Sequence, residues 1–269
     1  MGNGNGGFSP SNNHLGVNIA FTKFLFVVPR DPETIASRVR VAGSQIARGF
    51  FNDFDADGTR DVQPHETIHF LVAADPHPAA DGVGAAQYAV QVCGKYRPRL
   101  EEVEVELRRR LGDAADVLSI SGAERTPRYT SSELYEYAYR KAVCRKSGRI
   151  ARNVFVLPLN KSSDWWQQSS LERHGYFYPH TNVATGCPAH GHARAAAAGI
   201  ATIFRRLYHN PDGYQRTSEY DFVTYFECED EHVATFDGVC ASLRDTTGNP
   251  EWKYVSEGPL WRGTRVLKW

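Results

Sequence analysis

The chain has few cysteines, and their arrangement excludes several classes of protein. Its 269 residues include five, with no C-x-x-C pair among them: Cys93, Cys144, Cys187, Cys228 and Cys240. An odd number of widely spaced cysteines argues against a disulfide framework and favours a reducing, cytoplasmic compartment.

The chain also lacks an excess of charge of either sign and any long apolar run. Lys+Arg and Asp+Glu both number 31, so the formal net charge is zero. This balance argues against a nucleic-acid-binding surface spread over the whole molecule. No apolar stretch reaches the roughly 20 residues that span a membrane, and the glycine-rich start lacks the order of a secretory signal. We expect no nucleic-acid or membrane partner, and a disordered leader over residues 1–15.

The common motifs for phosphate binding and serine hydrolysis, G-x-x-x-x-G-K-[ST] and G-x-S-x-G, are missing too. The segment Asp53–Asp61 begins like a calcium loop, with acids at positions 1, 3, 5 and 9 and glycine at 6. Pro64 stands at position 12, where the loop needs a bidentate glutamate. A polar turn is therefore the favoured interpretation, with calcium binding as the alternative.

The hydrophobic pattern predicts strands interleaved with a few helices in each half of the chain. Strands are expected near residues 17–28, 67–73, 116–122, 154–159, 205–208, 220–227, 253–255 and 264–267. Helices are expected near residues 31–51, 79–110 (broken at Arg97-Pro98), 188–204 and 229–243, with a further one opening at Ser169. This β-α-β-β-α-β order predicts an α+β fold, in which two ferredoxin-like halves, 16–150 and 151–269, form one α+β barrel.

The second half contains an unusual set of aromatic, histidine and arginine residues. Trp165 and Trp166 follow the predicted strand 154–159, a histidine- and alanine-rich segment comes next, and Arg205 opens a later strand. Together they suggest a pocket for a large flat aromatic ligand with a metal at its centre. Haem is the natural candidate, held without covalent bonds because C-x-x-C-H is absent.

Imidazole is the commonest axial ligand of such a haem, and His180, His190 and His192 are the best-placed histidines. Cys187 with His190 and His192 has ligand types suited to zinc, but no fourth ligand is evident, so zinc ranks below haem.

Ordinary structural roles compete with each of these interpretations. Large aromatic side chains such as Trp165 and Trp166 are common core residues. Of the adjacent pair Arg205 and Arg206, at least one must be solvated. If the other points into a cavity, it provides a fixed cation for an anionic substrate.

Taken together, these residues resemble the chlorite dismutase family of haem b proteins, and most closely its longer, pentameric branch. The resemblance covers about Asn153 to Trp261, through NVFVLPLNKSSDWW, SSLER, FRRLYH and YDFVTYFE, and more faintly residues 116–129. It implies a homo-oligomer that decomposes chlorite, a small anion, to chloride and dioxygen through a ferryl intermediate. Arg205 would be the catalytic residue that holds hypochlorite near the iron.

The resemblance also implies roles for the other residues. It gives propionate anchors (Lys161 and Tyr129), tryptophans beside the haem (Trp165 and Trp166) and a distal aromatic side chain (Phe226).

The axial histidine is less simple, because counting forward from Lys161 gives His180 and counting backward from Arg205 gives His192. About twelve extra residues lie between, and the segment near 178–191 is interpreted as a loop insertion. We prefer His192, which shares a predicted helix with the approach to Arg205, and keep His180 as the alternative. Asp245 or Glu251 would then polarise the imidazole.

Other functions within this fold family are weighed against chlorite decomposition. Leu157 stands where the coproheme decarboxylases of this family have a catalytic tyrosine, and Arg205 replaces their distal glutamine, which disfavours that activity. The insertion leaves room for a related haem enzyme acting on a peroxide or an N–O compound, including an aldoxime dehydratase-like one. A non-catalytic haem carrier is disfavoured, because it needs no distal cation.

Overall fold

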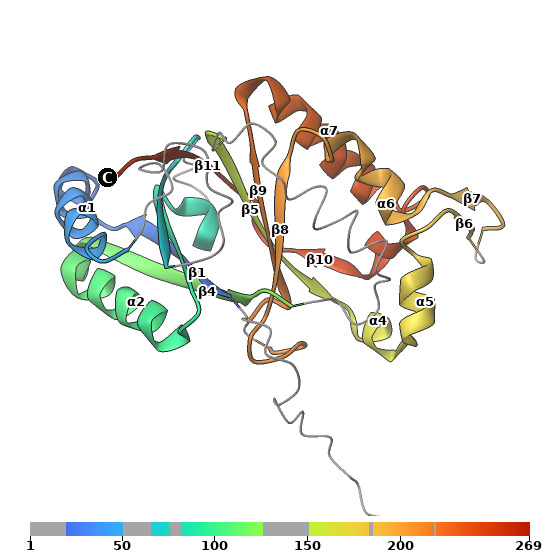
Figure 1. Ribbon diagram of the computed structural model, residues 1–269, viewed down its shortest axis with the longest axis horizontal. Coiled ribbons are helices and arrows are strands. Elements are labelled where there is room, and N and C mark those ends of the chain that lie inside the picture. The colour runs from blue at the N-terminus through green and yellow to red at the C-terminus, as the bar shows by residue number, and fades with distance from the viewer. Residues whose placement is uncertain (1–19, 51–65, 76–81, 126–150, 183–184, 218) are drawn as a thin grey trace, which may run out of the picture.

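The computed structural model describes residues 20–50, 66–75, 82–125, 151–182, 185–217 and 219–269 (Figure 1). The predicted leader, the Asp53–Asp61 segment and Tyr129 lie outside the described residues. No described helix is long and apolar enough to cross a membrane.

The N-terminal half has a ferredoxin-like arrangement. Its elements are β1 (Phe21–Pro29), α1 (Pro32–Ile46), β2 (Thr67–Ala73), β3 (Tyr88–Gly94), α2 (Arg97–Leu111) and β4 (Ala115–Ala123). The strands pair antiparallel in the order β4-β1-β3-β2. Asp31 caps α1 through a bond from Glu33 N to its Oδ1 of 3.1 Å, as its position before Pro32 predicts.

The C-terminal half repeats this arrangement with more material between its first two long strands. Its elements are β5 (Asn153–Lys161), α4 (Ser163–Gln167), α5 (Ser170–Gly175), β6 (His180–Thr181), β7 (Pro188–Ala189), α6 (Gly191–Ala195), β8 (Phe204–His209), β9 (Phe222–Cys228), α7 (Val233–Arg244), β10 (Val255–Glu257) and β11 (Trp261–Val266). The strand order β11-β5-β9-β8 matches that of the first half. The predicted α+β fold with two ferredoxin-like halves is therefore confirmed.

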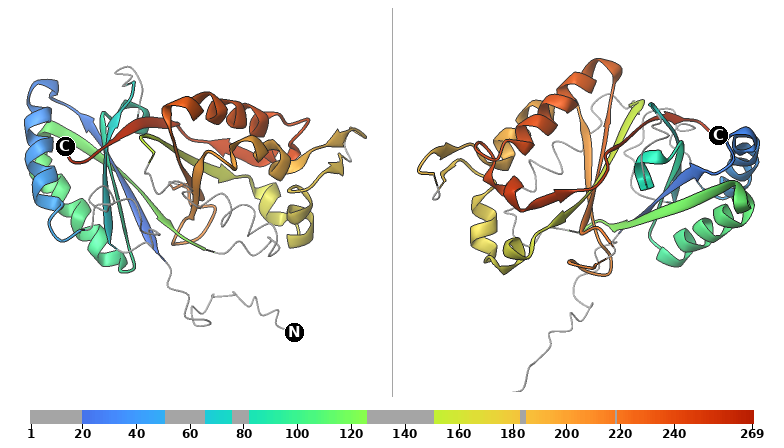
Figure 2. Two further views of the ribbon diagram at one scale, coloured as in Figure 1. Left: turned by 45° about the horizontal axis from the view of Figure 1, so that its top comes forward. Right: turned by 180° about the vertical axis from the view of Figure 1, so that it is seen from behind.

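The two sheets join edge to edge into a closed barrel of eight strands, through β2–β11 on one side and β4–β8 on the other. The short strand β10 adds to β5 beside β11. Helices α1 and α2 cover the outside of the N-terminal sheet, and α4 to α7 lie beside the C-terminal sheet (Figures 1 and 2). The β6–β7 hairpin projects beyond α5 and α6.

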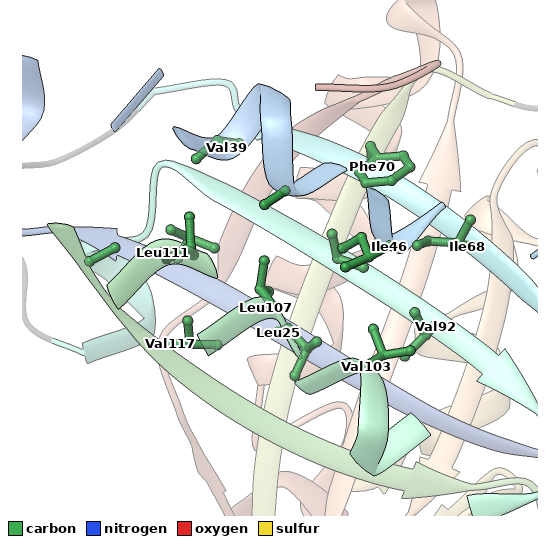
Figure 3. Close-up of a cluster of buried hydrophobic side chains, with 14 of the residues drawn as sticks. Leu25, Val39, Ile46, Ile68, Phe70, Val92, Val103, Leu107, Leu111 and Val117 are labelled. Carbon is green, nitrogen blue, oxygen red and sulfur yellow. The ribbon is translucent and has the colours of Figure 1, made fainter. Parts of the chain in front are cut away.

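Three apolar clusters follow from this arrangement, because alternate residues of each strand face opposite sides of the sheet. Leu25, Ile68 and Val92 pack outward against α1 and α2 (Figure 3). Phe24, Phe26 and their neighbours fill the barrel. A third cluster, which includes Phe155, Phe226 and Phe236, lies between the C-terminal sheet and α7.

The structure corrects two predicted helices. Residues 88–94, expected within a helix, form β3, which is buried from Ala89 onward between β1 and β2. Burial on both faces hides the alternation that would mark a strand. In the predicted helix 188–204, only Gly191–Ala195 is α-helical, because Pro188–Ala189 pairs in the hairpin and a 3-10 turn follows at Ala197–Gly199.

Smaller boundary errors occur at helix ends. Helix α1 stops at Ile46 rather than near Phe51. Residues Pro250–Tyr254 form a 3-10 turn, so the strand expected at 253–255 begins only at Val255.

Candidate functional site

Strand alternation separates the two adjacent arginines. Arg205 pairs with Phe226 across β8 and β9, and Phe226 in turn pairs with Phe155. The Phe226 and Phe155 rings lie 5.2 and 3.8 Å from the Phe236 ring of α7, so this row of residues faces the helices. Arg206 belongs to the opposite face, where its Nε lies 3.1 Å from Glu124 Oε1. Arg205 is therefore the arginine on the helix-covered face.

His192 lies on α6, which packs against the same face through Ala195. Its Nδ1 donates to Glu251 Oε2 at 2.7 Å. The Phe177 and Trp252 rings lie 5.1 and 6.5 Å from the imidazole. Its Nε2 is buried and has no hydrogen-bond partner in the described part of the chain. One ring nitrogen is thus held in place, while the other is desolvated and available to a ligand.

Glu251 also binds Lys161, whose Nζ lies 2.6 Å from its Oε1. Both side chains are only 5% exposed. Burial alone would raise the pKa of the Glu251 carboxyl, but Lys161 and His192 hold that pKa well below its usual range. The carboxylate is therefore ionised and can only accept, so Nδ1 of His192 is the donor, and in the neutral imidazole the lone pair is on Nε2. The Lys161 ammonium is thus bonded to Glu251, and its expected contact with a propionate stays a prediction.

The two tryptophans enter different aromatic clusters. Trp165 is fully buried, with its ring 5.7 Å from Tyr176 and 5.8 Å from Tyr254, and Lys161 Nζ lies 3.9 Å from its centroid. The hydroxyls of Tyr176 and Tyr254 are 3.1 Å apart, and burial together with this bond raises the pKa of Tyr176 to about 12. Trp166 instead stacks on Tyr214, with centroids 4.3 Å apart.

The alternative residues have other contacts. His180 lies in the β6–β7 hairpin, with Nδ1 2.8 Å from the Tyr178 carbonyl oxygen. Asp245 accepts from Thr247 N at 3.0 Å. Of the two expected carboxylates, Glu251 is therefore the one bonded to His192. No group of three or more His, Cys, Asp or Glu side chains that could hold a metal ion occurs among the described residues.

These donors fit a haem iron better than a metal held by protein ligands alone. Metal-binding histidines commonly donate their second ring N–H to a carboxylate, which orients the imidazole and raises its basicity. His192 and Glu251 have this arrangement, with a single buried nitrogen available. One protein ligand is sufficient when a porphyrin supplies the remaining bonds to iron.

Several residues around His192 were missed by sequence reasoning. Phe177 and Tyr176 precede the inserted hairpin, and Trp252 and Tyr254 follow α7. No spacing links these two segments, which meet only because β10 pairs beside the end of β5. Their aromatic content was the only available signal.

Gly191 is the first residue of α6 and sets the backbone position of His192. Its φ of +74° is unfavourable for other residues, and an added Cβ would lie 2.4 Å from the Tyr178 carbonyl oxygen. The surrounding backbone is tightly bonded, with His192 N donating to Tyr176 O at 2.9 Å and Gly191 N to Gly248 O at 3.0 Å. There is therefore little room for the backbone to yield.

We expect Gly191→Ala to shift His192 away from Glu251 and weaken haem binding about tenfold or more, since lost outer-shell support costs that much. Haem titration followed by absorbance measures the change. Gly186→Ala is the matched control, because Gly186 also has positive φ but nothing lies within 4 Å of an added Cβ. Equal haem affinities of the two variants would contradict the positioning role of Gly191.

Comparison with sequence models of protein families finds no match for the chain. Among solved structures, chlorite dismutase from Candidatus Nitrospira defluvii in complex with imidazole is similar, at 16% identity and a TM-score of 0.63, covering 94% of this chain and 92% of that one. A tryptophan-to-phenylalanine variant of the same enzyme in complex with cyanide matches with the same identity and TM-score over 92% and 90%. The chain therefore has the chlorite dismutase fold.

Proposed function

We propose that this protein is a haem b enzyme with His192 as the axial ligand of the iron. The buried, unpartnered Nε2 of His192, opposite an Nδ1 held by Glu251, is the observation that carries the proposal. The shared fold agrees with it. When bound, the haem supplies redox chemistry on small oxygen-containing substrates.

The protein's own residues have separate tasks in this proposal. Glu251 orients His192 through its bond to Nδ1, and Lys161 compensates the buried carboxylate. Trp165 and Trp166 line one side of the haem, and Phe226 lines the opposite side, which faces the sheet. Arg205 attracts an anionic substrate toward the sheet side, because its guanidinium stays charged at any working pH.

For the reaction, we propose decomposition of chlorite to chloride and dioxygen. This assignment rests on Arg205, which lies on the helix-covered face and can hold an oxyanion close to the reacting centre. We propose a homo-oligomer, a pentamer by the resemblance of the chain to the longer branch of the family.

Stopped-flow spectroscopy and an oxygen electrode test this proposal with the haem-loaded protein and chlorite. We expect oxygen evolution, with kcat/KM reduced about a hundredfold or more in Arg205→Ala, since one preorganised charge at a reacting oxyanion has about that effect. Arg206→Ala is the matched control and should retain wild-type activity, because Arg206 lies on the opposite face. No oxygen evolution at micromolar protein with a normal haem spectrum would reject chlorite as the substrate.

The β6–β7 hairpin favours one alternative, a related enzyme acting on a peroxide or an N–O compound. The hairpin runs directly into the segment that holds His192, and the residues before the hairpin are bonded to that segment, with His192 N donating to Tyr176 O and Ala193 N to Phe177 O. Turnover of hydrogen peroxide or an aldoxime, with no oxygen from chlorite, would support this alternative.

A further inference from the structure

A second group of polar atoms is buried on the same face of the C-terminal sheet, at the far end of β8. His209 lies in an aromatic cluster with Trp166, Tyr214 and Phe222. Trp166 and Tyr214 stack, and the His209 ring lies 5.1 Å from Phe222 in an edge-on arrangement. The Tyr214 hydroxyl lies 2.8 Å from His209 Nδ1. This contact fixes the orientation of the imidazole.

Two ring nitrogens in this cluster have no hydrogen-bond partner in the described part of the chain: His209 Nε2 and Trp166 Nε1. His209 is only 1% exposed, so its nitrogen lies out of reach of bulk water. A buried polar group without a partner costs about 1–3 kcal/mol, which makes two in one cluster a strong indication of a missing ligand.

Both nitrogens are donors. Indole Nε1 can only donate. We assign the proton of the neutral imidazole to Nε2, with the Tyr214 hydroxyl donating to His209 Nδ1. Burial, together with the nearby charge of Arg125, lowers the pKa of His209 to about 4, so at neutral pH the ring is uncharged and carries this one proton. The missing ligand is therefore an acceptor, as an oxygen of a carboxylate is.

The position of His209 separates this acceptor from the substrate. His209 and Arg205 face the same side of β8 with Leu207 between them, because alternate strand residues share a face. Four strand residues span roughly 13 Å, too far for a small anion held by Arg205 to reach His209. A flat macrocycle on this face would extend that far, with its carboxylates at its edge.

We propose that His209 is a binding residue whose Nε2–H donates to a carboxylate at the edge of the bound haem, with Tyr214 as its positioning residue. Trp166 Nε1 donates to a carboxylate at the same edge of the haem. This inference rests on the proposed haem function. It gives the carboxylate anchor to His209, whereas Lys161 is bonded to Glu251.

The test compares haem b with its dimethyl ester, in which both carboxylates are blocked. Dissociation constants are measured with the full-length apoprotein, wild type and His209→Leu, by transfer to excess apomyoglobin. We expect His209→Leu to bind haem b about tenfold or more weakly, as loss of a hydrogen bond to a charged group predicts, and the dimethyl ester almost as tightly as wild type does. His209→Gln, which keeps an amide N–H, should recover part of the haem b affinity.

The outcomes separate this inference from the proposed function. If wild type shows no haem spectrum, the haem function itself is rejected. If haem binds normally and His209→Leu binds haem b as tightly as wild type does, the anchor is rejected and the function stands. Equal weakening toward haem b and its ester would show that His209 acts only through packing, and it would also reject the anchor. Circular dichroism of the apoproteins establishes that each variant folds.

Discussion

Replacing His192 with alanine is expected to abolish the Soret spectrum of the normal haem complex. Nε2 of His192 is the buried nitrogen to which iron would bind, and its Nδ1 is already fixed by Glu251. Since loss of an outer-shell partner of a metal ligand costs 10–100-fold in affinity, loss of the ligand itself should exceed about a hundredfold. Haem titration of the apoprotein, followed between the Soret and visible bands, measures this loss.

His180→Ala is the decisive control, because His180 is the alternative axial ligand. Its Nδ1 contacts the Tyr178 carbonyl oxygen within the projecting hairpin, and it contacts neither Glu251 nor Lys161. We expect this variant to retain the wild-type haem spectrum. A normal spectrum in His192→Ala, together with its loss in His180→Ala, would transfer the axial role to His180 and overturn the proposed site.

The second large effect is expected for Lys161→Met, a substitution of similar volume. It removes the cation that compensates Glu251 in an environment where both side chains are 5% exposed. Breaking a buried ion pair by removing one partner costs about 3–5 kcal/mol, because the remaining charge cannot be solvated. Urea unfolding of the apoprotein at pH 7 should show a loss of about this size.

Adding Glu251→Gln to Lys161→Met should recover much of the lost stability, because the uncompensated charge is then gone and the amide oxygen can still accept from His192. A double variant no more stable than Lys161→Met would show that the loss came from packing and not from charge.

The pH dependence of unfolding provides a further check on the same pair. The pKa of Glu251 is lower in the folded protein than in the unfolded chain, so its contribution is complete above the unfolded value of about 4.3. That contribution decreases as the pH falls toward the folded value. Wild type should therefore lose more stability below about pH 4 than the double variant, which lacks this carboxyl. Identical acid profiles would contradict the assigned pKa shift.

Much of the fold was predictable from the chain alone. Strand β2 is a short apolar run bounded by polar residues, and β4 partly alternates between buried and more exposed residues, so both are recognisable from the local sequence. The helix predicted to open at Ser169 is confirmed, and Ser169 and Glu172 form both bonds of a capping box there. The failures, β3 and the segment after Pro188, occur where burial on both faces or pairing within a hairpin overrides local preference.

The sequence by itself determined which residue types gather near the site. Adjacent tryptophans after a buried strand, histidines after an insertion and paired arginines at the start of another strand were all visible as a local pattern. Because these features are local, they indicated a class of ligand and the candidate residues without a structure.

Only the tertiary structure decided between the members of each pair. Strand register sends Arg205 toward the helices and Arg206 to the opposite face. The choice of Glu251 over Asp245, and its bond to Lys161, depends on residues 90 positions apart meeting beside β10. His209 was overlooked because a buried nitrogen without a partner is a property of its surroundings. Such contacts join segments whose separation in sequence contains no information about their distance in space.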